Sequence, residues 1–406
     1  MGTIKYSVLA MMVAMGVVMT SCGGSNDEPN PGPQDTKLKR TVLLYAIASN
    51  NLYSNLISDK EEIITAANTS NISDVAFLLY QVTPNGTPQL LELKKTESGE
   101  YDFDIAKTYD RDLYSTDPER IREVIDDALD YKPADSYGLI LWSHGFGMDP
   151  GTATHPRAVI NTKGDDTDSM LVSMPMVHWF GADKNSDKDP NYTDHANVDE
   201  LAAAIPDHTF DFIWFDACYM SEIEVIYEFR DKCDTFVGYP TEVLAEGMPY
   251  QKTMPHILQA KSDLTGAAES FFQYFNEETS YNIATIAVCD MAHIEDVAEA
   301  AKSIQSIAMP VDTYGLQCYT RSTTGPFYDF RQVTRLKGGG SEEAVNAFNK
   351  AMEKFVVWSA ATKKDFNNRP ITPENFSGIS TYLFDPEKND SKNTYYKTLD
   401  WYKRVY

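Results

Sequence analysis

The sequence predicts an α/β fold in which helices cover both faces of a mostly parallel central sheet. From Arg40 to about Val288, short apolar runs rich in β-branched and aromatic residues alternate with amphipathic, helix-like segments, a pattern typical of a three-layer α/β/α arrangement. Two of the runs, ending at Ser143 and Phe215, are apolar almost throughout, as expected for strands covered on both faces. The chain has 406 residues, 42% of them hydrophobic, which is enough for a large core.

The first element is an export signal at residues 1–21. Lys5 supplies a positive charge, and the apolar run Val8–Val18 is too short to span a membrane comfortably. The small residues before Cys22 resemble the bacterial lipoprotein signal, which predicts cleavage there and a lipid on Cys22. Plain secretion and a retained membrane helix are the alternatives. Residues 22–39 form a polar tether, so we expect a protein of the bacterial cell envelope, lipid-anchored at the outer membrane or cell surface.

The next segments predict about six strands in the main sheet, joined by helices. Helices are expected near residues 56–67 and 197–205, and at Asp117-Pro118, where Asp117 can cap and Pro118 suits the first helical position. We assign residues 40–310 to one domain. Residues 311–406, with a helix over 341–360 and a strand over 379–383, form a C-terminal region expected to pack on it. The predicted strands of the main sheet are residues 41–48, 75–80, 137–143, 210–215, 235–239 and 283–288.

Charge and cysteine content limit the partners. The formal net charge of −25, from 60 acidic and 35 basic residues, argues against nucleic acid as a partner and favours cationic substrates. We expect a monomer. Cys218, Cys233, Cys289 and Cys318 are too widely spaced for a disulfide scaffold or a Cys-x-x-Cys metal site. If Cys218 is a free nucleophile, at most one disulfide can form among the other three.

Two motifs carry candidate chemistry, because each directly follows a predicted strand. Ser143-His144-Gly145 and Phe215-Asp216-Ala217-Cys218 would be delivered to the same edge of a parallel sheet, and a thiol with a nearby imidazole is what a cysteine hydrolase needs. Ser221 and Glu224 form a capping-box pattern, which would place Cys218 near a helix N-terminus that favours a thiolate. The backbone amides of Gly145 and Cys218 are candidate oxyanion donors. From these residues alone, a cysteine at a strand end is more often a small buried apolar residue than a nucleophile. A His-Gly pair is a turn as often as a catalytic base.

The segments Thr41–Ala46, Leu141–Gly147 and Phe215–Met220 together resemble the clostripain family of cysteine peptidases. The resemblance implies the caspase-like fold shared with gingipains, legumains and caspases. It implies an endopeptidase that cleaves after Arg or Lys, with Cys218 as nucleophile and His144 as general base and acid. Asp216 matches the family's acidic position for a substrate cation, with a turn-capping role as its alternative. Glu242 is a second substrate-binding candidate.

The resemblance also bears on activation. Members of the family are often made as zymogens and cut in the loop after the catalytic histidine. Here that loop, residues 145–196, contains the basic residues Arg157, Lys163, Lys184 and Lys188. Self-cleavage in this loop is therefore expected. The segment Val243–Tyr250 only partly matches the family's corresponding loop, which leaves the shape of the specificity pocket open.

The same loop carries candidate calcium ligands. Their spacing follows that of a calcium loop, but Lys188 stands where such a loop needs glycine, and no capped helices flank it. A solvated acidic loop is the alternative. Because relatives of the clostripain family can depend on calcium, the resemblance allows a calcium ion here. We expect that the protein requires no cofactor. The candidate ligands are Asp183, Asn185, Asp187, Asp189 and Asp194.

Two other functions stay open beside the endopeptidase with basic specificity. One is a non-catalytic surface lipoprotein of the same fold that binds a cationic peptide or protein. The other is a peptidase that cuts after Asn or small residues. A zinc peptidase is disfavoured because the histidines lack a spacing such as His-Glu-x-x-His. The sequence also contains no phosphate-binding loop or dinucleotide-binding fingerprint.

Overall fold

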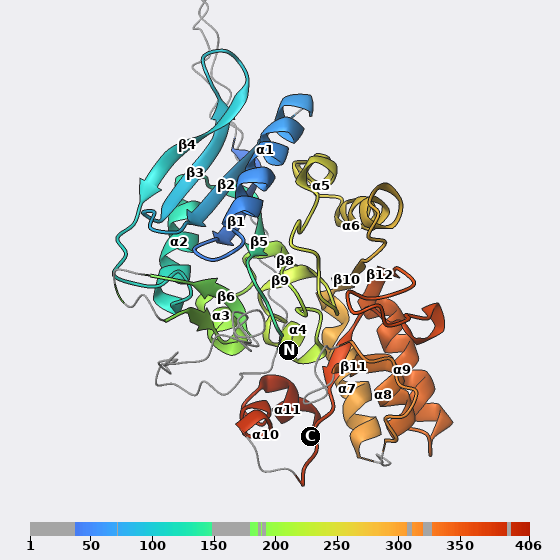
Figure 1. The fold of residues 1–406 in the computed structure, drawn as a ribbon. Coiled ribbons are helices and arrows are strands. Elements are labelled where there is room, and N and C mark those ends of the chain that lie inside the picture. Colours follow the sequence, from blue (N-terminus) through green and yellow to red (C-terminus); the bar gives the residue numbers. More distant parts are fainter. Residues whose placement is uncertain are drawn as a thin grey trace, which may run out of the picture. The chain divides into compact units, whose positions relative to one another are not determined.

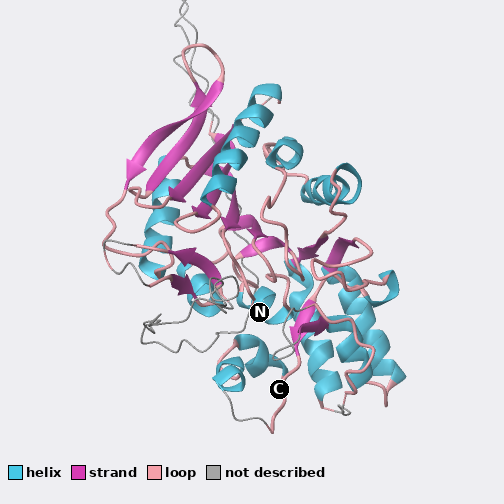
Figure 2. Ribbon diagram, in the orientation of Figure 1, coloured by secondary structure: helices cyan, strands magenta, loops and turns pink. Residues whose placement is uncertain are grey.

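In the computed structural model, nine strands of the described residues form one central mixed sheet (Figures 1 and 2). The structure describes residues 37–70, 72–147, 179–185, 188, 192–306, 311–319, 327–387 and 391–406. The strand order is β12-β10-β9-β8-β5-β1-β2-β3-β4. Five central strands are mutually parallel: β2 (Val75–Val82), β1 (Leu38–Ile47), β5 (Ala134–Trp142), β8 (Phe210–Asp216) and β9 (Cys233–Gly238). Antiparallel strands extend both edges: β3 (Gln89–Lys95), β4 (Tyr101–Thr108), β10 (Thr285–Asp290) and β12 (Val356–Ala361).

Helices cover both faces of this sheet (Figure 1). Because successive side chains of a strand point to opposite faces, alternate residues of β1 belong to different cores. Leu43 and Tyr45 pack in one core cluster, and Val42 and Leu44 in the other. The fold prediction, an α/β/α arrangement around a largely parallel sheet, is confirmed. The Val42 side carries α1 (Tyr53–Thr69), α5 (Tyr250–Ile257) and α6 (Leu264–Gln273); the Leu43 side carries α2 (Pro118–Tyr131), α3 (Val198–Ala204), α4 (Ile223–Glu228) and α7 (Ile294–Gln305).

The C-terminal residues add elements beside α4 and α7. β13 pairs with β11, and the Ser380 amide donates to the Ser221 carbonyl over 2.9 Å. Segments some 160 residues apart are thereby joined close to Cys218 in the chain. The elements are β11 (Phe327–Asp329), α8 (Phe330–Lys337), α9 (Glu342–Phe355), β13 (Ser380–Tyr382), α10 (Ser391–Tyr396) and α11 (Asp400–Val405), with helical turns at Tyr274–Glu278, Met291–His293 and Pro373–Asn375.

All six predicted strands exist. The sheet also contains β3, β4 and β12, which were not predicted as strands. The helix expected over 341–360 was predicted too long, because α9 ends at Phe355 and Val356–Ala361 is β12. The β-branched and aromatic residues Val356, Val357 and Trp358 favour a strand, and pairing with β10 decides the conformation.

The N-terminal signal and the tether up to residue 36, including Cys22, lie outside the described residues. The tether was predicted to reach residue 39, which is too long, because β1 already begins at Leu38. Within the described part of the chain, no helix has the length and apolar character needed to cross a membrane. The four described cysteines, Cys218, Cys233, Cys289 and Cys318, are free thiols.

The predicted capping box after Cys218 does not form. α4 begins at Ile223, with Glu222 as its N-cap residue and no capping bond from a side chain. Glu224 instead points into the core, where Oε1 accepts hydrogen bonds from the Thr381 hydroxyl (2.7 Å) and the Tyr382 amide (3.3 Å). Tertiary hydrogen bonds to β13 thus replace the local cap that the sequence pattern predicts.

We expect Glu224 to make stability depend on pH. Burial raises the pKa of this carboxyl to about 7 from 4.5, against the hydrogen bonds that favour its charged form. The folded state then holds the proton more tightly, so this contribution to stability is present below about pH 4.5 and lost as the pH rises through 7. Glu224 should therefore make the free energy of unfolding of the wild type fall between about pH 5 and 8. In Glu224→Gln this fall should be smaller by roughly 1–3 kcal/mol.

Urea unfolding at both pH values measures this effect. Glu97→Gln is the matched control, because Glu97 is exposed and its loss should leave the pH dependence as in the wild type. An equal pH dependence in Glu224→Gln and the wild type would contradict this assignment.

Candidate active site

His144 and Cys218 emerge from neighbouring parallel strands at the same level. The last paired residues of β5 and β8 are Trp142 and Asp216, and the two candidates each follow two residues later. The segments touch directly: a Cβ placed on Gly145 would lie 2.8 Å from the Ala217 Cβ and 2.8 Å from the Cys218 carbonyl oxygen. Only glycine allows this approach. The sheet therefore brings the two motifs together at its carboxyl edge.

The turn after Cys218 holds a strained backbone. Tyr219 has φ of 61°, a left-handed conformation that is unfavourable for a bulky residue. Its amide donates to the Thr241 carbonyl over 3.0 Å, and its ring packs against Phe146 and Phe327 at centroid distances of 5.9 and 6.2 Å. These contacts hold a sharp turn that directs the preceding residue, Cys218, away from the strand.

The half-buried Cys218 thiol lies against the segment that follows β9. The Val243 amide donates to Sγ over 3.4 Å, and Sγ lies 3.6 Å from the Val243 carbonyl oxygen. An N–H group directed at sulfur stabilises negative charge there. The segment that contains Glu242 thus runs beside the sulfur.

The His144 ring is oriented by a residue that follows β1. Its Nε2 lies 2.8 Å from Oδ1 of Asn51, so Nε2–H donates to the amide oxygen when the ring is neutral. Burial, and to a lesser extent the positive charge of Lys184, lowers the pKa of His144 to about 4. The imidazole is therefore neutral at neutral pH and can accept a proton.

A two-stranded hairpin, β6 (Phe180–Asp183) and β7 (Asp194–Ala196), holds the backbone around His144. The Gly181 amide donates to the His144 carbonyl over 2.8 Å, and the Phe146 amide donates to the Trp179 carbonyl over 2.9 Å. His195 of β7 bonds the Gly181 carbonyl through Nδ1. The hairpin therefore fixes the backbone of residues 144–146.

Asp216 lies beneath the 244–250 segment and is buried. Its carboxylate accepts bonds from the Met248 amide (3.0 and 3.1 Å) and from the hydroxyls of Tyr250 (3.2 Å) and Tyr239 (3.4 Å). Burial raises the pKa of Asp216 to about 6 despite these bonds. The pKa of the nearby Asp59 is raised to about 9, first by the burial of Asp59 itself and second by the negative charge of Asp216. Protein donors therefore hold the Asp216 oxygens in this structure.

Glu242 is the neighbour of a residue that contacts the sulfur. It directly precedes Val243, the residue in contact with Sγ, and its Oε2 accepts a bond from the Asn367 amide group over 3.2 Å. Asn367 belongs to the C-terminal region. Glu242 thus places a carboxylate next to the segment that borders the thiol.

The calcium candidates fall partly within the described residues, and Asp187 and Asp189 lie outside them. Asp183 accepts bonds from the Ser49 hydroxyl and the Ser115 amide, and Asp194 accepts one from the Thr116 hydroxyl. The Asn185 side chain donates to the Arg111 carbonyl over 2.9 Å. Across the described residues, no cluster of three or more His, Cys, Asp and Glu side chains is arranged to hold a metal ion.

Two features of the site were not identified from the sequence. Asn51 lies in the turn after β1, and its only sequence signal is a polar residue at the carboxyl end of a strand. Val243 acts through its backbone, which leaves no trace in residue type. Both depend on strands that are distant in sequence from His144 and Cys218.

A thiol and an imidazole at adjacent strand ends are the groups that a cysteine hydrolase needs. The chain belongs to the clostripain family, peptidase C11, whose sequence profile matches residues 44–174 and 173–406. The family membership predicted from the segments Thr41–Ala46, Leu141–Gly147 and Phe215–Met220 is thereby confirmed.

Three relatives illustrate the similarity. An inactive zymogen C11 protease from Parabacteroides distasonis is 30% identical with a TM-score of 0.73, and covers 91% of this chain and 99% of that one. A secreted C11 cysteine protease from Bacteroides thetaiotaomicron, solved with an irreversible peptide inhibitor, is 25% identical with a TM-score of 0.74, over 91% and 99% of the chains. Clostripain of Hathewaya histolytica is 26% identical over an alignment of 247 residues, and the match covers 54% of this chain but only 42% of clostripain.

Proposed function

We propose that this protein is a cysteine endopeptidase that uses a His144–Cys218 dyad and cleaves after Arg or Lys. The observation that carries the proposal is that the two residues follow the ends of β5 and β8 at the same level, together with the close approach of Gly145 to the Cys218 segment. Membership of a cysteine peptidase family supports the reaction class.

In the proposed reaction, neutral His144 takes the proton of the Cys218 thiol, and the thiolate attacks the scissile carbonyl. The backbone amides of Gly145 and Cys218 donate to the oxyanion. His144 then protonates the leaving amine, and a thioester remains on Sγ. Water, deprotonated by His144, hydrolyses the thioester, which releases the new carboxylate and regenerates the thiol.

For the substrate cation we favour Glu242 as the direct partner. Its neighbour Val243 borders Sγ, so a side chain beside the scissile bond can reach this region. The Asp216 carboxylate is held by Met248, Tyr239 and Tyr250. We infer that Asp216 positions the 244–250 segment and adds negative potential beneath the pocket.

We also propose export, with a lipid on Cys22, and activation by cleavage in the loop that follows His144. A solved relative is described as an inactive zymogen and another as secreted. The Lys184 backbone is held on both sides, by the Ser49 hydroxyl at its amide and by Arg111 at its carbonyl. Cleavage needs an accessible backbone, so these bonds argue against Lys184 as the cleaved position. The peptide assay with and without calcium tests whether activity depends on this ion.

Hydrolysis of fluorogenic peptides ending in Arg, Lys, Asn or Asp tests the reaction, with and without calcium, before and after limited proteolysis. We expect release after Arg and Lys that is lost, by a factor of ~1000 or more, in Cys218→Ala and in His144→Ala. Cys318→Ala, which removes the other half-buried thiol, is the control and should keep full activity. No turnover of any peptide would favour the non-catalytic binding protein, and cleavage after Asn would favour the other specificity.

Replacing Asn51 by Ala should lower kcat roughly tenfold to a hundredfold with little change in KM, because the ring loses the partner that orients it. Asn51→Asp keeps an acceptor and adds a negative charge, which raises the pKa of His144 and moves the acidic limb of the kcat profile to higher pH. Ser54→Ala, at an exposed residue three positions on, should change neither parameter. If the pH profile of kcat is not shifted in Asn51→Asp while the free energy of unfolding is reduced, Asn51 has a structural role only.

Glu242→Gln should lower kcat/KM about tenfold or more for peptides with Arg at the cleaved position, because a charge-assisted bond is lost. The same variant should cleave a peptide with the uncharged isostere citrulline as the wild type does. Glu246→Gln, an exposed change in the same segment, is the control. An equal loss for both peptides would show that Glu242 does not read the charge.

A further inference from the structure

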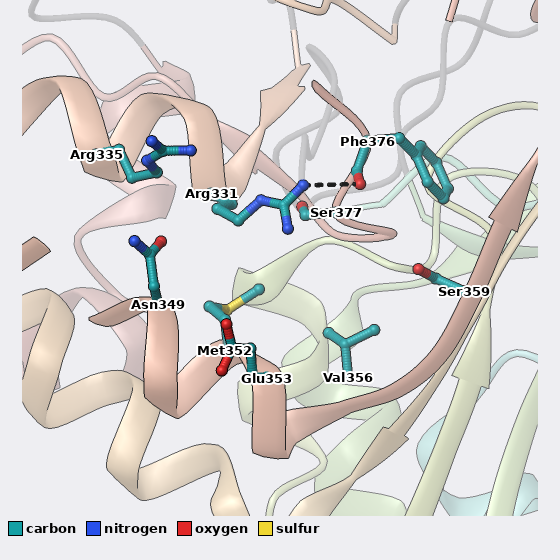
Figure 3. Close-up of a pocket in the computed structure, with 9 residues that line it drawn as sticks. All are labelled: Arg331, Arg335, Asn349, Met352, Glu353, Val356, Ser359, Phe376 and Ser377. Carbon is teal, nitrogen blue, oxygen red and sulfur yellow. Dashed lines mark hydrogen bonds between the residues drawn. The ribbon is translucent and has the colours of Figure 1, made fainter. Parts of the chain in front are cut away.

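A cavity of about 400 Å³ lies between α8, α9, β12 and residues 373–377 (Figure 3). Its elements belong to the C-terminal region and contribute neither His144 nor Cys218. Charged groups of both signs line it, with an apolar floor between them. The lining residues used below are Arg331, Arg335, Asn349, Met352, Glu353 and Val356.

Two arginines one turn apart on α8 provide donors. Arg331 is anchored, because one of its terminal nitrogens donates to the carbonyls of Phe376 (3.0 Å) and Glu374 (3.3 Å). Arg335 is exposed, and its guanidinium pairs with no acid among the described residues. A fixed and a free guanidinium on neighbouring positions of a helix suit a carboxylate, which arginine binds in a bidentate manner.

Complementary acceptors come from α9. The Oδ1 atom of Asn349 is buried and has no hydrogen-bond partner in the described structure, a costly state that a ligand N–H would relieve. Figure 3 shows the Asn349 amide and the Arg335 guanidinium at the same end of the cavity. Glu353, four residues after Asn349, is exposed and forms no ion pair with any described residue. Met352 and Val356 supply the apolar floor.

We propose that this cavity binds the C-terminal residue of a peptide. The carboxylate lies on Arg335 and Arg331, the N–H of the last residue donates to Asn349 Oδ1, and the aliphatic part of its side chain packs on Met352 and Val356. A basic end group reaches Glu353. A peptide just cut after Arg or Lys carries this combination of groups, so the preference for a basic end rests on the proposed function.

Calorimetric titration of the full chain with Cys218→Ala tests the site, using a hexapeptide with a free C-terminal Arg as the probe. We expect Arg335→Gln to weaken binding about tenfold or more, and amidation of the probe to weaken it similarly. Glu353→Gln should weaken binding of the probe but not of the same peptide ending in Leu. Lys350→Gln, an exposed charge change on α9, is the control and should bind as the parent does.

Two results would place the peptide at the active site and overturn the proposal. One is an affinity that is unchanged in Arg335→Gln, and the other is an equal affinity for the probe with a free C-terminal carboxylate and for the amidated probe. Hydrolysis by the otherwise wild-type chain with and without Arg335→Gln separates this inference from the proposed function. Binding that depends on Arg335 without any hydrolysis would refute the peptidase but keep the carboxylate site. Hydrolysis with no effect of Arg335 on binding would refute the carboxylate site alone.

Discussion

The parallel pairing of β5 with β8 is the constraint on which the candidate site depends. Its register ends with Trp142 opposite Asp216, so the next turns carry His144 and Cys218 to one edge of the sheet. The strands are covered on both faces, and Leu141 and Phe215 are completely buried. A slip of one residue would turn these side chains to the wrong faces. The core therefore fixes the level at which the two candidate catalytic groups leave the sheet.

Distant segments then fix the conformation of the two turns. The Thr241 carbonyl holds the strained Tyr219, Val243 contacts Sγ, and Ser380 bonds Ser221. On the histidine side, Gly181 bonds the His144 backbone and Asn51 bonds the ring. These contacts come from four separate parts of the chain. Such support is what holds a left-handed tyrosine next to a candidate nucleophile.

Sequence patterns predicted the elements that local composition decides. The apolar runs gave the six strands, Pro118 marked the start of α2, and the two motifs fell at the ends of β5 and β8. Features decided by tertiary contacts were missed or predicted wrongly. Val356–Ala361 became a strand because β10 offers an edge, and Glu224 bonds β13 instead of capping α4. Asn51 could not be linked to His144 without the order of the strands, because 93 positions separate them.

Activation of Cys218 by His144 can be measured through the alkylation rate of each cysteine. Mass spectrometry after timed exposure to iodoacetamide would follow Cys218 against Cys318, the other half-buried thiol, while burial raises the pKa of Cys233 and Cys289 and keeps them slow. We expect Cys218 to react first and His144→Ala to slow Cys218 alone. Equal rates for Cys218 and Cys318, or a rate at Cys218 that is unchanged in His144→Ala, would contradict it.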